Sequence, residues 1–298
     1  MKKVSIIIPT FNRKKFIKTA IKSAIMQTYP NTEIIVVDDN SNYDISKEIN
    51  EFKNKIILIK NKKNLGCAAT LNIGIKASSG DYITILDDDD IFHPKKIERQ
   101  MNIFYKNPNI GLVYCPIGIK RNNKIVYKPP KSEKNKWIRL AYQNDIGITP
   151  LIKRECFEKC GYFDVEFKYH EDRELWYRIG KKYKFAFNKE PSYIIYNLKI
   201  NRMSSQINNI YSGKKLLYEK YKKDFENKNR YYSDFHYEIA YEYLNFGYLK
   251  EFFNHFKKSV KLNPYKLKEF FKIPGKMINY SSVKSNINLE KYQISPNI

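Results

Sequence analysis

Length, composition and charge exclude several classes of protein. The chain has 298 residues, 42% of them hydrophobic and 15% aromatic, which is enough to bury the core of one large or two smaller globular domains. No apolar run approaches the roughly 20 residues that cross a bilayer, and the apolar stretch after Met1 is too short for a signal peptide. We therefore expect a globular protein of the cytoplasm.

The formal charge of +24 indicates an anionic partner, which would be nucleic acid, an anionic membrane surface or an acidic substrate. A biased amino-acid composition is the alternative, because lysine occurs along the whole chain. No signature of a nucleic-acid-binding module occurs, so nucleic acid is not an expected partner. The four scattered cysteines do not complete a zinc site and are expected to be free thiols.

Apolar strands and amphipathic helices alternate in the first third of the chain. The predicted elements are a strand at 4–9, a helix at 15–27, a strand at 33–37, a helix at 45–52, a strand at 55–60, a helix at 68–77 and a strand at 82–86. Continuous β-branched runs separated by helices of about ten residues are typical of parallel βαβ units. The sequence therefore predicts an α/β fold with a mostly parallel, Rossmann-like sheet.

Polar side chains follow three of these strands. They are Thr10 and Asn12 after the first strand, Asp38 and Asp39 after the second, and Asp87, Asp88, Asp89 and Asp90 after the fourth. Ligands of such sheets bind outside the carboxyl ends of the strands, so the three sets are expected to share one crevice. Carboxylates suit Mg²⁺ or Mn²⁺ bound to substrate phosphates. The alternative is an acidic turn that caps a helix starting near Pro94, with Asp90 at its entrance.

The pattern changes in the later part of the chain. We expect a strand at 111–115, a hairpin and loop at 120–136, a short helix at 154–160, a helix headed by Glu171 and Asp172, and a last strand at 192–196. Residues 206–298 are helical, aromatic and basic, and within them 237–264 resemble one helical hairpin of the tetratricopeptide type. The expected organisation is a domain at 1–205, with halves at 1–115 and 116–205, and a helical extension at 206–298.

Several motifs in this order resemble the family 2 inverting glycosyltransferases, which have the GT-A fold. They are VSIIIPTFNR at 4–13, VVDDNS at 36–41, NLG at 64–66, NIG at 72–74 and LDDDD at 86–90. GYFD at 161–164, followed by Glu171 and Asp172, resembles the segment of that family on the acceptor side. The resemblance is dense over residues 1–115 and thinner to about residue 205.

The resemblance implies a metal-dependent transfer of a sugar, with inversion, from a nucleotide sugar (a UDP-sugar) to a hydroxyl of a surface glycan or lipid-linked acceptor, with Mn²⁺ or Mg²⁺ as cofactor. The residues expected to bind the nucleotide sugar are Pro9, Thr10, Phe11, Asn12, Arg13, Asp39, Asn64, Gly66, Asp87 and Asp88. Asp39 would accept the uracil imide hydrogen and Phe11 would stack on the base. Asp87 would lie near the ribose, and Asp89, together with Asp87, would bind the metal.

Asp172 is the expected catalytic base, with Glu171 as the neighbour that positions it or substitutes for it. Inversion requires a base that removes the acceptor proton on the face opposite the leaving diphosphate. The alternative is that both carboxylates only favour a helix N-terminus through its dipole. Leu71 stands where many relatives carry an arginine, so Arg13 or a lysine is expected to supply the missing phosphate contact.

Two other functions stay open at this point. A nucleotidyltransferase would share the nucleotide crevice and acidic site, but it usually has a glycine-rich basic loop after the first strand, unlike residues 9–12. A non-catalytic membrane-surface or interaction protein with a degenerate transferase domain is the third possibility. The basic extension would then contact anionic lipid at the inner membrane face, or simply present a solvated basic surface.

Overall fold

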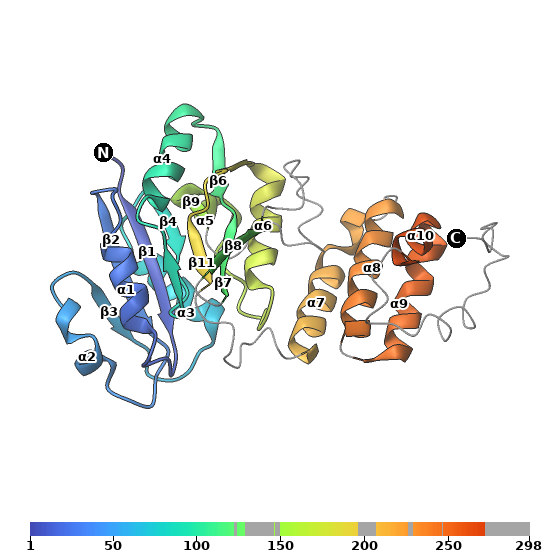
Figure 1. Ribbon diagram of the computed structural model, residues 1–298, viewed down its shortest axis with the longest axis horizontal. Helices are drawn as coiled ribbons and strands as arrows, with labels where there is room; N and C mark the ends of the chain where they lie inside the picture. Colours follow the sequence, from blue (N-terminus) through green and yellow to red (C-terminus); the bar gives the residue numbers. More distant parts are fainter. Residues whose placement is uncertain are drawn as a thin grey trace. The chain divides into compact units, whose positions relative to one another are not determined.

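The computed structural model describes residues 1–121, 124–128, 146, 150–195, 207–225, 229–245 and 247–271. The chain divides into two compact units, one made of residues 1–140 and 144–203 and the other of residues 141–143 and 204–298. Among the described residues, all strands belong to the first unit, and the second unit is helical (Figure 1).

A seven-stranded sheet forms the centre of the first unit, in the order β10-β6-β9-β4-β1-β2-β3. Its strands are β1 (Val4–Thr10), β2 (Thr32–Asp38), β3 (Ile57–Lys60), β4 (Tyr82–Ile85), β6 (Ile110–Tyr114), β9 (Leu151–Lys153) and β10 (Lys184–Phe187). The four strands nearest the N-terminus are parallel, as predicted. The short strand β9 was not predicted, and it runs antiparallel between β4 and β6.

A second sheet of four strands has the order β5-β11-β7-β8. Its strands are β5 (Asp90–Phe92), β7 (Ile117–Arg121), β8 (Lys124–Lys128) and β11 (Tyr193–Ile195). Asp90 therefore opens a strand, in which it pairs with Ile195, and the next helix begins only at Lys96. The alternative in which Asp90 stands at the entrance of that helix is wrong, because pairing with β11 draws the residue into the sheet.

Six helices and one 3₁₀ turn complete the first unit among the described residues. They are α1 (Ile17–Ile25), α2 (Ile45–Glu48), the turn η1 (Asn50–Phe52), α3 (Cys67–Ala77), α4 (Lys96–Lys106), α5 (Arg154–Cys160) and α6 (Glu171–Lys182). The single helix predicted over 45–52 is divided into α2 and η1. Ile49 and Asn50, which lie at the break, are weak helix formers.

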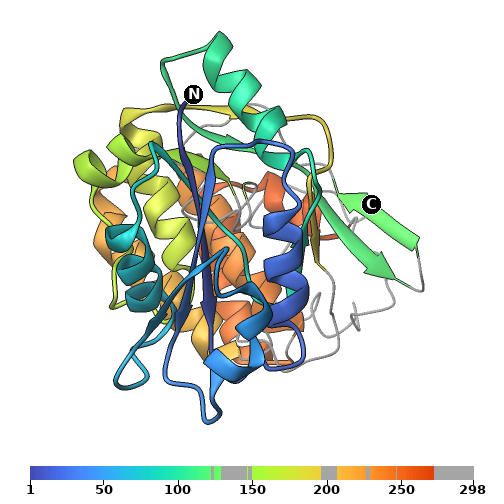
Figure 2. The same cartoon turned by 90° about the vertical axis from the view of Figure 1, so that its left-hand side faces the viewer.

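Successive side chains of β1 point to opposite faces of the sheet, and helices pack against both faces. Ile6 and Ile8 point to one face and pack in the same buried cluster as Ile21 of α1. Ile7 points to the opposite face, where a Cβ added to Gly74 of α3 would lie 2.5 Å from Ile7 Cγ2. Glycine at this position therefore lets α3 approach the sheet closely, and α1 and α3 lie on opposite sides of β1 (Figure 2).

The second unit is built from four helices in the part of the chain described here. They are α7 (Ile207–Phe225), α8 (Asn229–Asn245), α9 (Leu249–Leu262) and α10 (Tyr265–Phe271). Helices α8 and α9 pack against each other as consecutive elements, over the segment predicted as a helical hairpin. Phe252, Phe256 and Phe270 are almost fully buried and pack against one another with centroid separations of 4.8–5.5 Å. This unit therefore has an aromatic core of its own.

Buried polar groups in the second unit occur in pairs. Lys214 of α7 forms an ion pair with Glu242 of α8. His236 Nδ1 lies 2.9 Å from His255 Nδ1, across α8 and α9. Burial, with the nearby charge of Lys258, lowers the pKa of His236 to about 3 and that of His255 to about 4, so both rings are neutral. No helix among the described residues is both long enough and apolar enough to span a membrane.

Candidate active site

The carboxyl ends of three adjacent strands form the base of the site. β1 lies between β2 and β4 and is parallel to both, so the ends of the three strands meet at one edge of the sheet. Thr10, at the end of β1, is in register with Asp38 of β2, and its carbonyl accepts a hydrogen bond of 2.9 Å from the Asp39 backbone N–H. The polar groups predicted to share a crevice are therefore neighbours.

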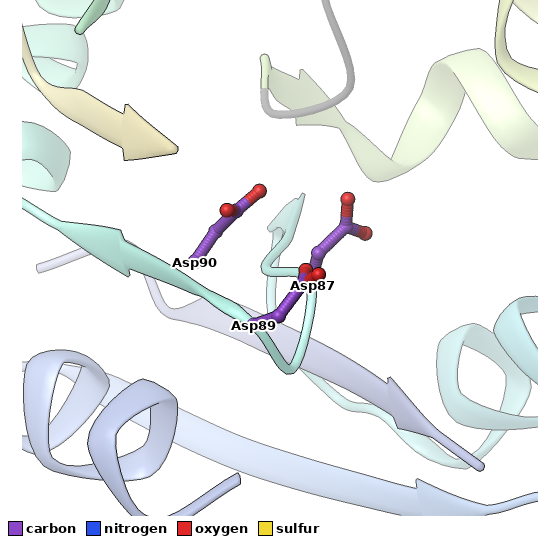
Figure 3. A group of neighbouring side chains, drawn as sticks. All are labelled: Asp87, Asp89 and Asp90. Atoms are coloured by element: carbon purple, nitrogen blue, oxygen red, sulfur yellow. The ribbon is translucent and has the colours of Figure 1, made fainter. Parts of the chain in front are cut away.

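The acidic turn after β4 brings three carboxylates together. The Asp90 backbone N–H donates to the Asp87 carbonyl at 3.1 Å, which closes a four-residue turn. One carboxylate oxygen from each of Asp87, Asp89 and Asp90 lies within 4.8 Å of the other two. Figure 3 shows these three side chains around a common space.

This cluster has the donor set of a divalent cation site. Carboxylate oxygens are the ligands of Mg²⁺ and Mn²⁺, and three of them around one point would repel one another without a cation. Arg13 Nη1 lies 3.5 Å from Asp89 Oδ2, and the Tyr193 hydroxyl donates a hydrogen bond to Asp90. The residues fit the expected cofactor, and Asp90 lies with Asp87 and Asp89, the two residues predicted to bind it. Its role depends on the pairing of β5 with β11, which local sequence does not reveal.

Asp88 points away from the cluster. Its Oδ2 accepts a hydrogen bond of 2.6 Å from the Thr10 hydroxyl, and both side chains are buried. Burial raises the pKa of Asp88 to about 7, although the Thr10 hydrogen bond opposes this shift. Asp88, expected to contact the nucleotide sugar, therefore ties the acidic turn to the end of β1.

Asp39 organises the loop before α3. Its Oδ1 accepts from the Asn61 amide and the Leu65 backbone N–H, both at 2.8 Å, and its Oδ2 accepts from the Gly66 N–H at 2.9 Å. Gly66 has φ +86°, a conformation that favours glycine. Each carboxylate oxygen has two lone pairs, so Oδ2 retains one acceptor site. Asn64, predicted to bind the nucleotide sugar, is exposed in the same loop.

The loop after β1 docks on the loop after β2. The Asn12 backbone N–H donates to the Ser41 hydroxyl at 2.9 Å, and the Asn12 side chain accepts from Asn42 N at 2.8 Å. Asp38 accepts from both Ser41 donors, whereas Asp44 caps α2 through Ser46 N. Asp38 therefore supports the loop after β2 and is not a helix N-cap.

The remaining predicted donor-side residues flank these loops. Phe11 is 43% exposed, so its ring is available for stacking. Pro9 is partly buried within β1. Leu71, at the position where the resemblance led us to look for a phosphate-binding arginine, is buried and contributes to the core.

A second acidic pair opens α6, and Cys67 connects it to the cluster. The Cys67 thiol, at the start of α3, donates a hydrogen bond to Glu171. Burial and the charge of Asp172 raise the pKa of Glu171 to about 8. The pKa of Cys67 is also raised, by burial and then by the charges of Glu171 and Asp87. Carboxylates of the acidic turn and of the first turn of α6 are therefore both close enough to Cys67 to act on its pKa.

Asn72 holds the acceptor-side segment against α3. Its side-chain amide donates to the Phe163 carbonyl at 2.8 Å and accepts from the Phe163 N–H at 2.9 Å. Sequence reasoning missed Cys67 and Asn72 as connecting residues, although Asn72 belongs to one of the quoted motifs. Residues 122–123 and 129–136 of the hairpin and loop predicted at 120–136 lie outside the described residues.

Comparison with known sequences identifies relatives of this chain. Residues 5–170 match the family model described as "Glycosyl transferase family 2". An uncharacterized glycosyltransferase of Haemophilus influenzae is 29% identical over 88% of this chain and 92% of its own length. WfgD of Escherichia coli, named as a UDP-Glc:alpha-D-GlcNAc-diphosphoundecaprenol beta-1,3-glucosyltransferase, is 35% identical over 60% of this chain and 70% of its own. A Rickettsia prowazekii relative is 36% identical, and the match spans 61% of its length.

Comparison with solved structures identifies the fold. TarS of S. aureus superposes with a TM-score of 0.67 and 15% identity, over 90% of this chain and 50% of TarS. The mannosyltransferase PcManGT of Pyrobaculum calidifontis, in complex with GDP-Man and Mn²⁺, gives a TM-score of 0.66 and 15% identity, over 96% and 84% of the two chains. This likeness confirms the predicted GT-A fold, with its mostly parallel sheet and helical C-terminal region.

Proposed function

Because the chain belongs to glycosyl transferase family 2 and is a glycosyltransferase, we propose that it transfers a sugar, with inversion, from a UDP-sugar to a hydroxyl of a lipid-linked or surface glycan. The observation that carries the proposal is that acidic groups from two separate elements both lie close to Cys67. The cluster of Asp87, Asp89 and Asp90 follows β4, the pair of Glu171 and Asp172 opens α6, and Cys67 is close to both.

The donor site is proposed at the ends of β1 and β2. The remaining lone pair on Asp39 Oδ2 would accept the imide hydrogen of uracil, and the exposed Phe11 ring would stack on the base. TarS was solved with UDP-GlcNAc, and the E. coli relative is named for UDP-Glc, which supports a UDP-sugar. The GDP-Man complex of PcManGT makes GDP-sugars the first alternative to test.

The diphosphate is proposed to lie beside the acidic turn. Asp87, Asp89 and Asp90 would hold Mn²⁺ or Mg²⁺, which when bound supplies Lewis-acid neutralisation of the departing diphosphate. Arg13, beside Asp89, would donate to a phosphate oxygen and so provide the contact that Leu71 lacks. Asp88 and Thr10 would keep the turn and the end of β1 in register.

Asp172 is proposed as the catalytic base. Burial and the charge of Asp172 raise the pKa of Glu171, so one carboxyl of the pair is more readily protonated, and Glu171 would position Asp172. Asp172 would take the proton of the acceptor hydroxyl as that oxygen attacks the anomeric carbon. The new glycosidic bond forms on one face, the bond to the diphosphate breaks on the other, and UDP leaves with the electron pair.

The products of turnover test this function. The protein is incubated with Mn²⁺, a panel of UDP- and GDP-sugars, and a diphosphate-linked N-acetylglucosamine acceptor, and the anomeric configuration of the product is determined by NMR. We expect turnover with one UDP-sugar and inversion at the anomeric carbon. A product that retains the configuration of the donor would contradict the assignment of Asp172.

Peripheral contact with an anionic inner membrane face, from the cytoplasm, is the proposed setting for a lipid-linked acceptor. The exposed residues on α9 include Lys250, Lys257, Lys258 and Lys261, which are spaced by seven, one and three positions. At 100° per residue these positions fall on one side of the helix, opposite the buried Phe252 and Phe256. Such a basic side is attracted to anionic lipid.

A further inference from the structure

Arg173, in the first turn of α6, is a buried cation without a counter-charge among the described residues. The side chain is only 7% exposed. Its Nε and Nη1 are buried and donate no hydrogen bond, and no ion pair joins it to a carboxylate in the part of the chain described. Within the described part of the chain, the hydrogen bond that Arg173 makes is from its backbone N–H to Asp172 Oδ1, at 2.7 Å.

Arg178, also in α6, has a guanidinium whose hydrogen-bond donors are paired with protein acceptors. Arg178 donates to Glu174, at 2.8–3.0 Å, and also to the carbonyls of Cys160 and Tyr162. Its donors bind α6 to the preceding segment, which is a structural role. Arg173 has no such set of acceptors, so its burial does not serve the same purpose.

A buried guanidinium without partners is unfavourable in the free protein. Both the lost hydration of its N–H groups and the unpaired charge raise the free energy of the folded state. Such a group persists where a ligand supplies the missing acceptors. The planar fork of arginine matches the oxygens of phosphate, and the N-terminus of a helix adds a positive partial charge. The ligand indicated by this chemistry is a phosphate or diphosphate group.

The position of Arg173 links that anion to the reaction. Asp172, the proposed base, is its immediate neighbour, and successive Cα atoms are about 3.8 Å apart. We propose that Arg173 binds a phosphate group of a substrate and so positions this substrate at Asp172. The inference rests on the proposed function, in which two diphosphates are the sources of such a group: that of the nucleotide-sugar donor and that of a lipid-linked acceptor.

Binding measurements with three probes test the inference. UDP with Mn²⁺, an alkyl diphosphate ester of N-acetylglucosamine and the neutral alkyl glycoside of the same sugar are titrated by calorimetry into wild type, Arg173→Gln and Arg173→Lys. Arg230→Gln is the matched control, because Arg230 is an exposed arginine of α8. Loss of charge-assisted hydrogen bonds should weaken binding about 10- to 100-fold in Arg173→Gln, and less in Arg173→Lys.

The two sources of phosphate give different patterns. If the Arg173 variants bind only the diphosphate ester more weakly, Arg173 contacts the diphosphate of the acceptor. If they bind UDP more weakly, Arg173 contacts the diphosphate of the donor. Binding of the neutral glycoside should not change in either case. Unchanged affinity of both phosphate probes, or no binding of either to wild type, would overturn the inference. If Asp89→Asn does not change the affinity for UDP, the proposed donor site is refuted instead. Failure of the donor site is therefore distinguishable from failure of the inference on Arg173.

Thermal unfolding of the free variants separates binding from structure. Because an unpaired buried charge is removed, Arg173→Gln should be at least as stable as wild type in the absence of substrate. A clear decrease in Tm, of the size expected for loss of a paired arginine such as Arg178, would show that Arg173 has protein partners and would contradict its role in binding.

Discussion

The two units of the chain differ in how their buried ionisable groups are satisfied. In the helical unit they occur in pairs between helices, as Lys214 with Glu242 and His236 with His255. In the sheet unit Glu174 is paired with Arg178 of the same helix, but other acidic groups gather at strand ends and at the first turn of α6. Arg173, in the same turn, has no hydrogen-bond partner for its buried Nε and Nη1 among the described residues. Pairing of this kind stabilises a fold, whereas unbalanced charge at one edge of a sheet marks a place for a ligand.

Loss of the proposed base should have the largest effect. Asp172→Asn removes the proton acceptor, so kcat should fall about 100- to 10,000-fold, with little change in the affinity for UDP. The control is Glu166→Gln, an exposed carboxylate ahead of α6. Initial rates with the preferred UDP-sugar measure both. If Asp172→Asn keeps more than a tenth of the wild-type rate, Asp172 is not the base, and Glu171 and Asp172 only stabilise the N-terminus of α6 through the helix dipole.

Truncation in the aromatic core should affect only the helical unit. Phe256→Ala leaves a cavity next to Phe252 and Phe270, and it should destabilise that unit by about 3–5 kcal/mol. Circular dichroism should show helix lost at a lower temperature, while calorimetry gives an unchanged Kd for UDP. If Phe256→Ala lost UDP binding at a temperature where α7–α10 are still folded, the claim that the helical unit takes no part in UDP binding would be contradicted.

Neutralising the basic side of α9 should reduce membrane binding without changing catalysis. Each lysine near an anionic surface contributes about 1 kcal/mol, so the triple variant Lys257→Gln, Lys258→Gln, Lys261→Gln should partition roughly 100-fold less onto vesicles containing phosphatidylserine. The matched control is the triple variant of Lys53, Lys55 and Lys63, which are exposed in the first unit. Equal losses in both variants would mean that total charge, and not this helix, governs binding.

The stability of the two units should respond to pH with opposite sign. The pKa of Glu171 is raised from 4.5 to about 8, so its favourable contribution is complete below pH 4.5 and is lost as the pH rises toward 8. The pKa of His236 is lowered from 6.5 to about 3, so the helical unit loses stability as the pH falls below 6.5. Each slope is at most about 1.4 kcal/mol per pH unit, and solvent screening reduces the first.

Two variants test whether Glu171 and His236 cause the opposite dependences of stability on pH. Tm is measured from pH 4 to 9 for wild type, Glu171→Gln and His236→Phe. Glu171→Gln should gain most stability, relative to wild type, at pH 8 and above, and His236→Phe should gain most near pH 4. If the two differences follow the same trend with pH, the contrast between the buried groups of the two units is wrong.

Much of the donor half follows from local sequence. Apolar runs that end in polar residues predict β1, β2 and β4 and the meeting of their ends, because parallel strands present their carboxyl ends at one edge. The position of Asp90 in the cluster could not be predicted in this way. It depends on pairing with Ile195, more than a hundred residues away, and the adjacent sequence reads equally well as the approach to a helix.

The direction of each side chain within a run of identical residues also cannot be predicted from the sequence. Asp88 and its neighbours have the same chemistry, yet Asp88 alone turns toward Thr10, because the turn at 87–90 rotates one carboxylate away from the others. Likewise, Arg173 and Arg178 are equivalent in a helical pattern. Only packing shows that one is satisfied by carbonyls and a carboxylate and that the other is not.

Titration of UDP into the full chain tests the central claim most directly. Calorimetry is carried out with Mn²⁺, with EDTA, and with the variant Asp89→Asn, which keeps the size of the side chain but removes its charge. Glu166→Gln again serves as the control. The acidic cluster predicts binding with Mn²⁺ that is lost in EDTA and in Asp89→Asn and kept in Glu166→Gln. UDP binding that is indifferent to both the metal and Asp89 would contradict it.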